Sequence, residues 1–124
     1  MDEWFSGLMR HPRLTFRVAV REIESWVIAD RERFARFLGI QINLVPPYPD
    51  QLEDPKKTVL QLAQASPSRS LKKALLPAGR TARIGPGYND VMSEFVGSKW
   101  RAGVARSNSP SLHRAMTAVA SVTT

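Results

Sequence analysis

The N-terminal part of the chain contains an abrupt change of hydrophobic period, and this change constrains the fold more than any other feature. Phe16, Val18 and Val20 alternate with smaller or polar residues, a pattern typical of a β-strand. From Ile23 onward the apolar residues recur at helical spacing instead. The pattern predicts one strand over about residues 14–22 that leads into a helix. Because a lone strand cannot pair with itself, either a second chain pairs with it or the chain lacks the rest of its sheet.

Four to five helices are expected after the strand, with the interrupted first stripe counted once. An apolar stripe runs from Ile23 to Leu38, where Asp30 interrupts it as the expected N-cap of a second helix, and Gly39 is the expected C-cap. Further helices are expected over residues 55–65, 70–76, 91–100 and from 110 onward, with Asp-Pro and Ser-Pro pairs opening the first and the last of them. The predicted fold is therefore α/β and rich in helix.

A chain of 124 residues is expected to form one domain, or part of one. The predicted segments are an atypical N-terminal stretch over 1–13, a strand–helix junction over 14–39, a proline-rich connector over 40–54 and a basic helical part over 55–122. Successive prolines in the connector exclude a helix there.

The chain has no cysteine, which excludes a disulfide framework, a thiolate nucleophile and a cysteine-based zinc site. No apolar run approaches the roughly 20 residues needed to span a bilayer. The acidic start of the sequence is unlike a signal peptide. A cytoplasmic protein without a membrane span is therefore expected.

The net charge of +7 is unevenly distributed. Residues 1–54 contain nine acids and seven bases, whereas residues 55–124 contain two acids and eleven bases. Such a basic half suits a polyanionic partner, with nucleic acid first, although it is also compatible with a plain solvated surface. The residues expected to contact phosphates are Lys56, Lys57, Lys72, Lys73, Arg80, Arg83, Lys99 and Arg101.

Glu22 and Glu24 are the best candidates for chemistry. If the strand continues to Glu24, the two carboxylates share one face at its carboxyl end, where sheets of this class place their ligands. Such hard oxygen ligands suit Mg²⁺ or Mn²⁺. On a helix the same pair would diverge by about 200° and could not share a metal. The alternative is that both are first-turn helix acids that pair with nearby arginines.

A glycine-rich turn over residues 85–90 is the second candidate site. Gly85 and Gly87 could let backbone amides approach a phosphate, with Tyr88 and Asn89 beginning the following helix. The segment is neither a Walker A motif nor a GxGxxG motif. The alternative is a plain turn in which Asn89 or Asp90 caps that helix.

The segment Arg21–Asp30 resembles the E-x-E-x-W-L-L-A-D segment of a bacterial family of uncharacterised domains, which looks related to RloB-like and OLD-type Toprim proteins. The similarity spans about residues 14–120. It continues through Phe37-Leu38-Gly39, Pro46-Pro47, Asp54-Pro55-Lys56-Lys57, Gly85-Pro86-Gly87-Tyr88-Asn89, Phe95-Val96, Trp100 and Ser109-Pro110-Ser111-Leu112.

The resemblance implies the C-terminal half of a Toprim-like α/β domain with magnesium-dependent phosphodiesterase chemistry on nucleic acid, in defence against phage. Relatives of this kind use an early glutamate, a D-x-D pair and a later acid. Only the later acid has a counterpart here, Glu24, with Glu22 beside it. Because the D-x-D half is missing, the chain is expected to be inactive alone, as a fragment or as a subunit that a partner completes. The alternative is a non-catalytic basic helical module that binds nucleic acid or protein.

Overall fold

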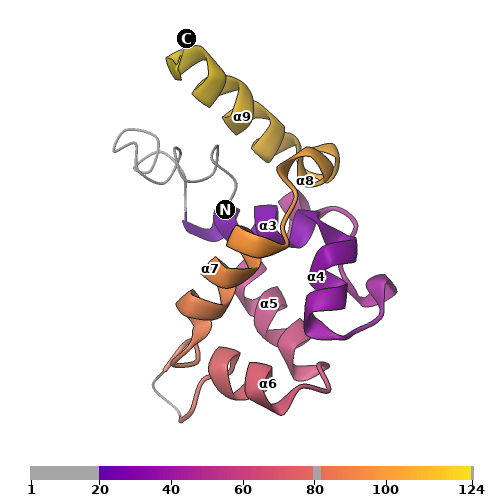
Figure 1. Cartoon of the computed structure of the whole chain (residues 1–124), viewed down its shortest axis with the longest axis vertical. Coiled ribbons are helices and arrows are strands. Elements are labelled where there is room, and N and C mark those ends of the chain that lie inside the picture. Colours follow the sequence, from indigo (N-terminus) through magenta and orange to yellow (C-terminus); the bar gives the residue numbers. More distant parts are fainter. Residues whose placement is uncertain (1–19, 80–81, 124) are drawn as a thin grey trace.

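The computed structural model describes residues 20–79 and 82–123, and these residues form a bundle of short helices (Figure 1). The elements are α3 (Val20–Ala29), α4 (Arg31–Leu38), η1 (Ile42–Leu44), η2 (Pro49–Gln51), α5 (Pro55–Gln64), α6 (Arg69–Leu75), α7 (Tyr88–Ser98), α8 (Ala102–Asn108) and α9 (Pro110–Thr123). Helix α9 lies at one end of the long axis and α6 at the other (Figure 1).

The predicted α/β fold with a clear strand over residues 14–22 is wrong, because the residues that the structure describes contain no strand. Residues 20–22 form the first turn of α3, and residues 14–19 lie outside the described ranges. A helix satisfies its backbone hydrogen bonds internally, whereas a strand needs a neighbour that the described part of the chain does not offer. The partner chain that was expected to complete a sheet stays a prediction.

Capping residues begin and end the helices where the sequence predicted. The side chains of Asp30, Asp54 and Ser109 accept hydrogen bonds from backbone amides in the first turns of α4, α5 and α9, respectively. Pro55 occupies the first position of α5. Gly39 ends α4 with a φ of 74°, a left-handed conformation that glycine adopts without steric cost. The predicted break at Asp30 and these caps are therefore confirmed.

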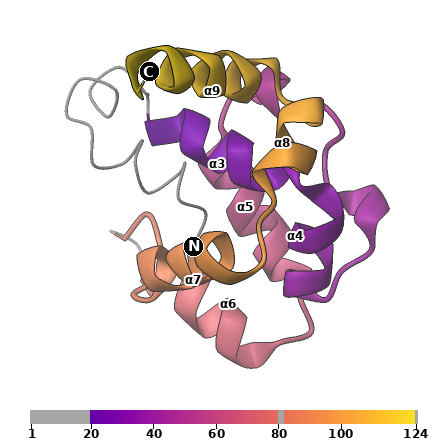
Figure 2. The same ribbon diagram turned by 45° about the horizontal axis from the view of Figure 1, so that its top comes forward.

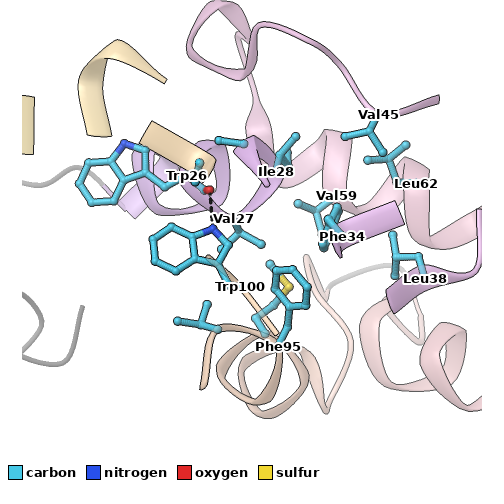
Figure 3. Close-up of a cluster of buried hydrophobic side chains, with 14 of the residues drawn as sticks. Trp26, Val27, Ile28, Phe34, Leu38, Val45, Val59, Leu62, Phe95 and Trp100 are labelled. Atoms are coloured by element: carbon cyan, nitrogen blue, oxygen red, sulfur yellow. Dashed lines mark hydrogen bonds between the residues drawn. The ribbon is translucent and has the colours of Figure 1, made fainter. Parts of the chain in front are cut away.

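Helix α3 is the centre of the packing, in contact with α5, α8 and η2 (Figure 2). Trp26 of α3 and Trp100, which follows α7, are both buried, and the Trp100 indole Nε1 donates a hydrogen bond of 2.9 Å to the Trp26 carbonyl oxygen (Figure 3). Phe34 of α4 meets Phe95 of α7 edge to face, with ring centroids 5.4 Å apart. These contacts join the N-terminal and C-terminal helices in one core that includes Trp100.

The connector between α4 and α5 contains two short 3-10 turns and no α-helix. Asp50 in η2 ties it to α9, because its carboxylate accepts hydrogen bonds from the Ser109 hydroxyl at 2.6 Å and the Ser111 amide at 2.7 Å. Arg31 holds the other turn through two hydrogen bonds from its guanidinium to the Val45 carbonyl oxygen. The proline-rich segment is thus fastened at both ends to the helices around it.

Candidate functional site

Glu24 is a buried carboxylate at the meeting point of three helices. Its Oε1 atom accepts a hydrogen bond of 3.3 Å from the Tyr88 hydroxyl of α7 and lies 3.8 Å from the Lys56 Nζ of α5. The Glu24 side chain is 7% exposed and that of Lys56 is 37% exposed. The Lys56 ammonium also lies 5.9 Å from the centre of the Tyr88 ring. The three side chains therefore join α3, α5 and α7 through one compensated charge.

One oxygen of the Glu24 carboxylate lacks a hydrogen-bond partner among the described residues. This atom, Oε2, is buried. A buried acceptor in this state carries a desolvation cost, so Glu24 is less completely satisfied than its first oxygen suggests.

The predicted glutamate pair lies on a helix instead of at the end of a strand. Glu22 and Glu24 both belong to α3, so the strand face that they were expected to share does not form there. The side chain of Glu22 lies outside what the structure describes. The described residues contain no group of three or more acids, histidines or cysteines that could hold a metal ion. One carboxylate beside an ammonium does not fit a divalent cation, and binding of Mg²⁺ or Mn²⁺ stays a prediction of the resemblance.

The glycine-rich turn lies against α6 instead of presenting its amides outward. The Gly85 amide donates to the Leu75 carbonyl oxygen at 2.8 Å, and the Gly87 amide donates to the Ala74 carbonyl oxygen at 2.9 Å. These bonds satisfy the two amides that were expected to approach a phosphate.

The helix after this turn starts at Tyr88, with Gly87 as its N-cap and no side-chain cap. Asn89 is exposed within its first turn. The alternative in which Asn89 or Asp90 caps this helix is therefore wrong.

The cations predicted to contact phosphates fall into two groups. Arg101 is committed to Asp30, since its backbone amide, Nε and Nη2 atoms donate to that carboxylate over 2.8–3.0 Å. The others lie at the start of α5, on α6, in the following loop and just after α7, and they are Lys56, Lys57, Lys72, Lys73, Arg83 and Lys99. Arg80 lies outside the described residues.

Comparison with family models, with curated proteins and with solved structures returns no match. The resemblance to Toprim-type proteins stays a prediction. No helix among residues 20–79 and 82–123 combines the length and the apolar character that crossing a membrane requires.

Arg33 and Arg36, which were not among the predicted phosphate contacts, lie near Lys99. Together with Phe37 they line a pocket between α4 and the end of α7. Their spacing of three residues on one helix was the available signal, because it places both arginines on the same face. The neighbouring Lys99 could not be assigned to that face from the sequence, since it lies more than 60 residues further along the chain.

The contact between Tyr88 and Glu24 predicts a loss of stability at alkaline pH. Burial raises the pKa of Tyr88, and the charge and hydrogen bond of Glu24 raise that pKa further. The folded protein therefore keeps the phenol proton at a pH where the unfolded chain, with a tyrosine pKa of about 10, has lost it. The stabilisation is complete below that pH, and the free energy of unfolding should fall by up to about 1.4 kcal/mol per pH unit above it.

Urea unfolding at several values between pH 8 and pH 11 checks this prediction. Tyr88→Phe should flatten the alkaline part of the profile, whereas Tyr48→Phe, which alters an exposed tyrosine, should leave it parallel to that of the parent protein. Profiles of the same slope for the Tyr88→Phe variant and the parent would contradict the prediction.

Proposed function

We propose that this chain is a non-catalytic helical module that binds nucleic acid through its basic surface. The observation that supports this most directly is the shortage of acidic partners for the cations of residues 55–123. Among the described residues of this part, Lys56 and Arg101 pair with acids, and the other lysines and arginines have no such partner. Those cations are Lys57, Arg69, Lys72, Lys73, Arg83, Lys99, Arg106 and Arg114, and all but the half-buried Lys72 are exposed.

Unpaired surface cations attract a polyanion for a simple reason. Each phosphate that a lysine or arginine neutralises releases condensed counterions, so binding gains entropy and weakens as salt is added. Cations already paired with an acid contribute less, because the pair must be broken or shared. The basic half of this chain therefore keeps most of its charge available for a partner of this kind.

A salt titration with duplex DNA and with single-stranded RNA tests the proposal. The logarithm of the binding constant should fall linearly with the logarithm of the salt concentration, with a slope of about 0.9 per phosphate contact for duplex DNA. The double variant Lys72→Gln, Lys73→Gln should bind more weakly and with a shallower slope. Glu94→Gln, which removes an exposed acid from α7, should act in the opposite direction. An affinity that does not depend on salt would contradict the proposal.

The same samples separate this proposal from magnesium-dependent hydrolysis, which the resemblance predicts. In the structure Glu24 is a buried link between helices, so Glu24→Gln should keep the nucleic-acid affinity within about threefold while lowering the free energy of unfolding by about 1 kcal/mol. Gel assays with and without Mg²⁺ detect cleavage directly. Magnesium-dependent cleavage that disappears in the Glu24→Gln variant would overturn the non-catalytic proposal in favour of the nuclease.

A further inference from the structure

We propose that the pocket between α4 and the end of α7 is a phosphate-binding site. Arg33, Arg36 and Phe37 come from α4, and Lys99 directly follows the last residue of α7. Packing of the Phe37 ring on that of Phe95, with centroids 5.0 Å apart, brings the two elements together. The Phe37–Phe95 contact thus also places three positively charged side chains around one pocket.

One of the arginines that line the pocket has an unsatisfied donor. The Nε atom of Arg33 is buried and has no hydrogen-bond partner in the described part of the chain. A guanidinium donor in that state is costly, and native proteins almost always supply an acceptor from the chain, from water or from a ligand. Because Arg33 lines the pocket, an anion there that reached this nitrogen would satisfy it.

The charges around the pocket favour an anion. Arg36 pairs with Glu32 at 3.3 Å, but both side chains are largely exposed, and such a pair is weak and easily rearranged. Neither Arg33 nor Lys99 pairs with an acid within residues 20–79 and 82–123. Two available cations and one that is shared leave the pocket with an excess of positive charge.

The combination of residues points to a phosphate group. Arginine presents a planar fork that matches two oxygens of a phosphate, and lysine adds a mobile point charge. The Phe37 ring supplies an apolar wall, which lowers the local dielectric and strengthens these interactions. The volume of about 290 Å³ lies just below the roughly 300–1,000 Å³ of sites that enclose a drug-sized ligand, so it suits a single charged group with part of its attachment.

We take the phosphate to be part of a nucleic-acid backbone. This choice of source rests on the proposed function. Free phosphate offers the same chemistry. The pocket itself can therefore be tested with inorganic phosphate alone, and its role in nucleic-acid binding with a short duplex.

The experiment compares Arg33→Gln and Lys99→Gln with Lys57→Gln, a control that removes one exposed charge from the start of α5. Inorganic phosphate is titrated by backbone amide NMR shifts, and a DNA duplex is titrated at several salt concentrations. Each pocket substitution should weaken phosphate binding by about tenfold or more, as expected for hydrogen bonds to a charged group. Each should also reduce the salt slope by about 0.9, the contribution of one phosphate.

The control should leave the affinity for inorganic phosphate unchanged. Its affinity for DNA should fall, because Lys57 is one of the cations proposed to contact nucleic acid. Arg33→Lys keeps the charge but removes Nε, so phosphate binding should be weaker than in the parent protein and tighter than in Arg33→Gln. Circular dichroism and the thermal midpoint show that each variant is folded, and Arg33→Lys keeps the test valid if Arg33→Gln does not fold.

The outcomes separate the two proposals. Equal loss of phosphate affinity in the pocket variants and the control, or no phosphate binding by the parent protein, overturns the pocket and leaves the nucleic-acid proposal standing. Phosphate binding that depends on Arg33 and Lys99, without any binding of DNA or RNA, supports the pocket and overturns the proposed function.

Discussion

Replacing Asp30 with alanine is expected to lower the free energy of unfolding by about 3 kcal/mol. The Asp30 side chain is completely buried and accepts hydrogen bonds from the Arg101 amide at 2.9 Å, from its Nε at 3.0 Å and from its Nη2 at 2.8 Å. It also caps α4 through the Arg33 amide at 3.4 Å. Alanine removes all of these interactions together.

The size of this loss in the free energy of unfolding depends on how well Arg101 is solvated after Asp30 is removed. Breaking a buried ion pair costs about 3–5 kcal/mol when the remaining charge stays buried. The Arg101 side chain is 35% exposed and can partly regain water, so the lower end of that range applies. Loss of a helix N-cap alone costs about 1 kcal/mol, so the helix cap is the smaller part of the effect.

Glu32→Ala is the matched control, because it removes an acid two residues further along the same helix. Glu32 pairs with Arg36, yet the two side chains are 56% and 69% exposed, so the expected loss is below about 1 kcal/mol. Urea unfolding followed by circular dichroism measures both variants. Similar losses for the two substitutions would show that the Asp30–Arg101 pair is not the anchor that the geometry indicates. Asp30→Asn, which keeps a cap acceptor without the charge, should lie between them.

Local signals carried the correct part of the sequence prediction. Asp30, Asp54 and Gly39 act within one helical turn of their own positions, so the rules for helix ends are sufficient to place them. The predicted strand also rested on a local pattern, and that prediction was wrong. A short alternating apolar run is compatible with more than one structure, and the helical spacing that begins at Ile23 extends back to Val20 in the structure.

The candidate sites depend on contacts between distant parts of the chain, which no local pattern encodes. Glu24 meets Tyr88 from 64 residues away, and Asp30 meets Arg101 from 71 residues away. Without a matching relative, nothing in the sequence pairs these residues. The charge asymmetry was visible in advance, but the division of its cations between ion pairs and open surface was not. Arg101 therefore changes from a predicted phosphate contact into a structural residue.

Gly85→Ala is expected to lower the free energy of unfolding by about 3 kcal/mol, in the upper part of the range for overpacking. A Cβ atom at Gly85 would lie 2.2 Å from the Ala74 carbonyl oxygen and 2.6 Å from the Leu75 carbonyl carbon. Both are backbone atoms of the α6 region, which cannot rotate away as a flexible side chain could. The backbone must separate, and that movement also stretches the hydrogen bond from the Gly85 amide to the Leu75 carbonyl oxygen.

Gly103→Ala is the matched control, with the same added methyl group and the opposite sign. A Cβ at Gly103 has no atom within 4 Å, and the residue lies in α8, so alanine should raise the free energy of unfolding by about 0.5–1 kcal/mol through its higher helix propensity. Urea unfolding of the two variants checks both signs. A Gly85→Ala variant as stable as the parent would mean that the turn does not lie against α6, and its amides would then be free for the phosphate that the glycine spacing predicted.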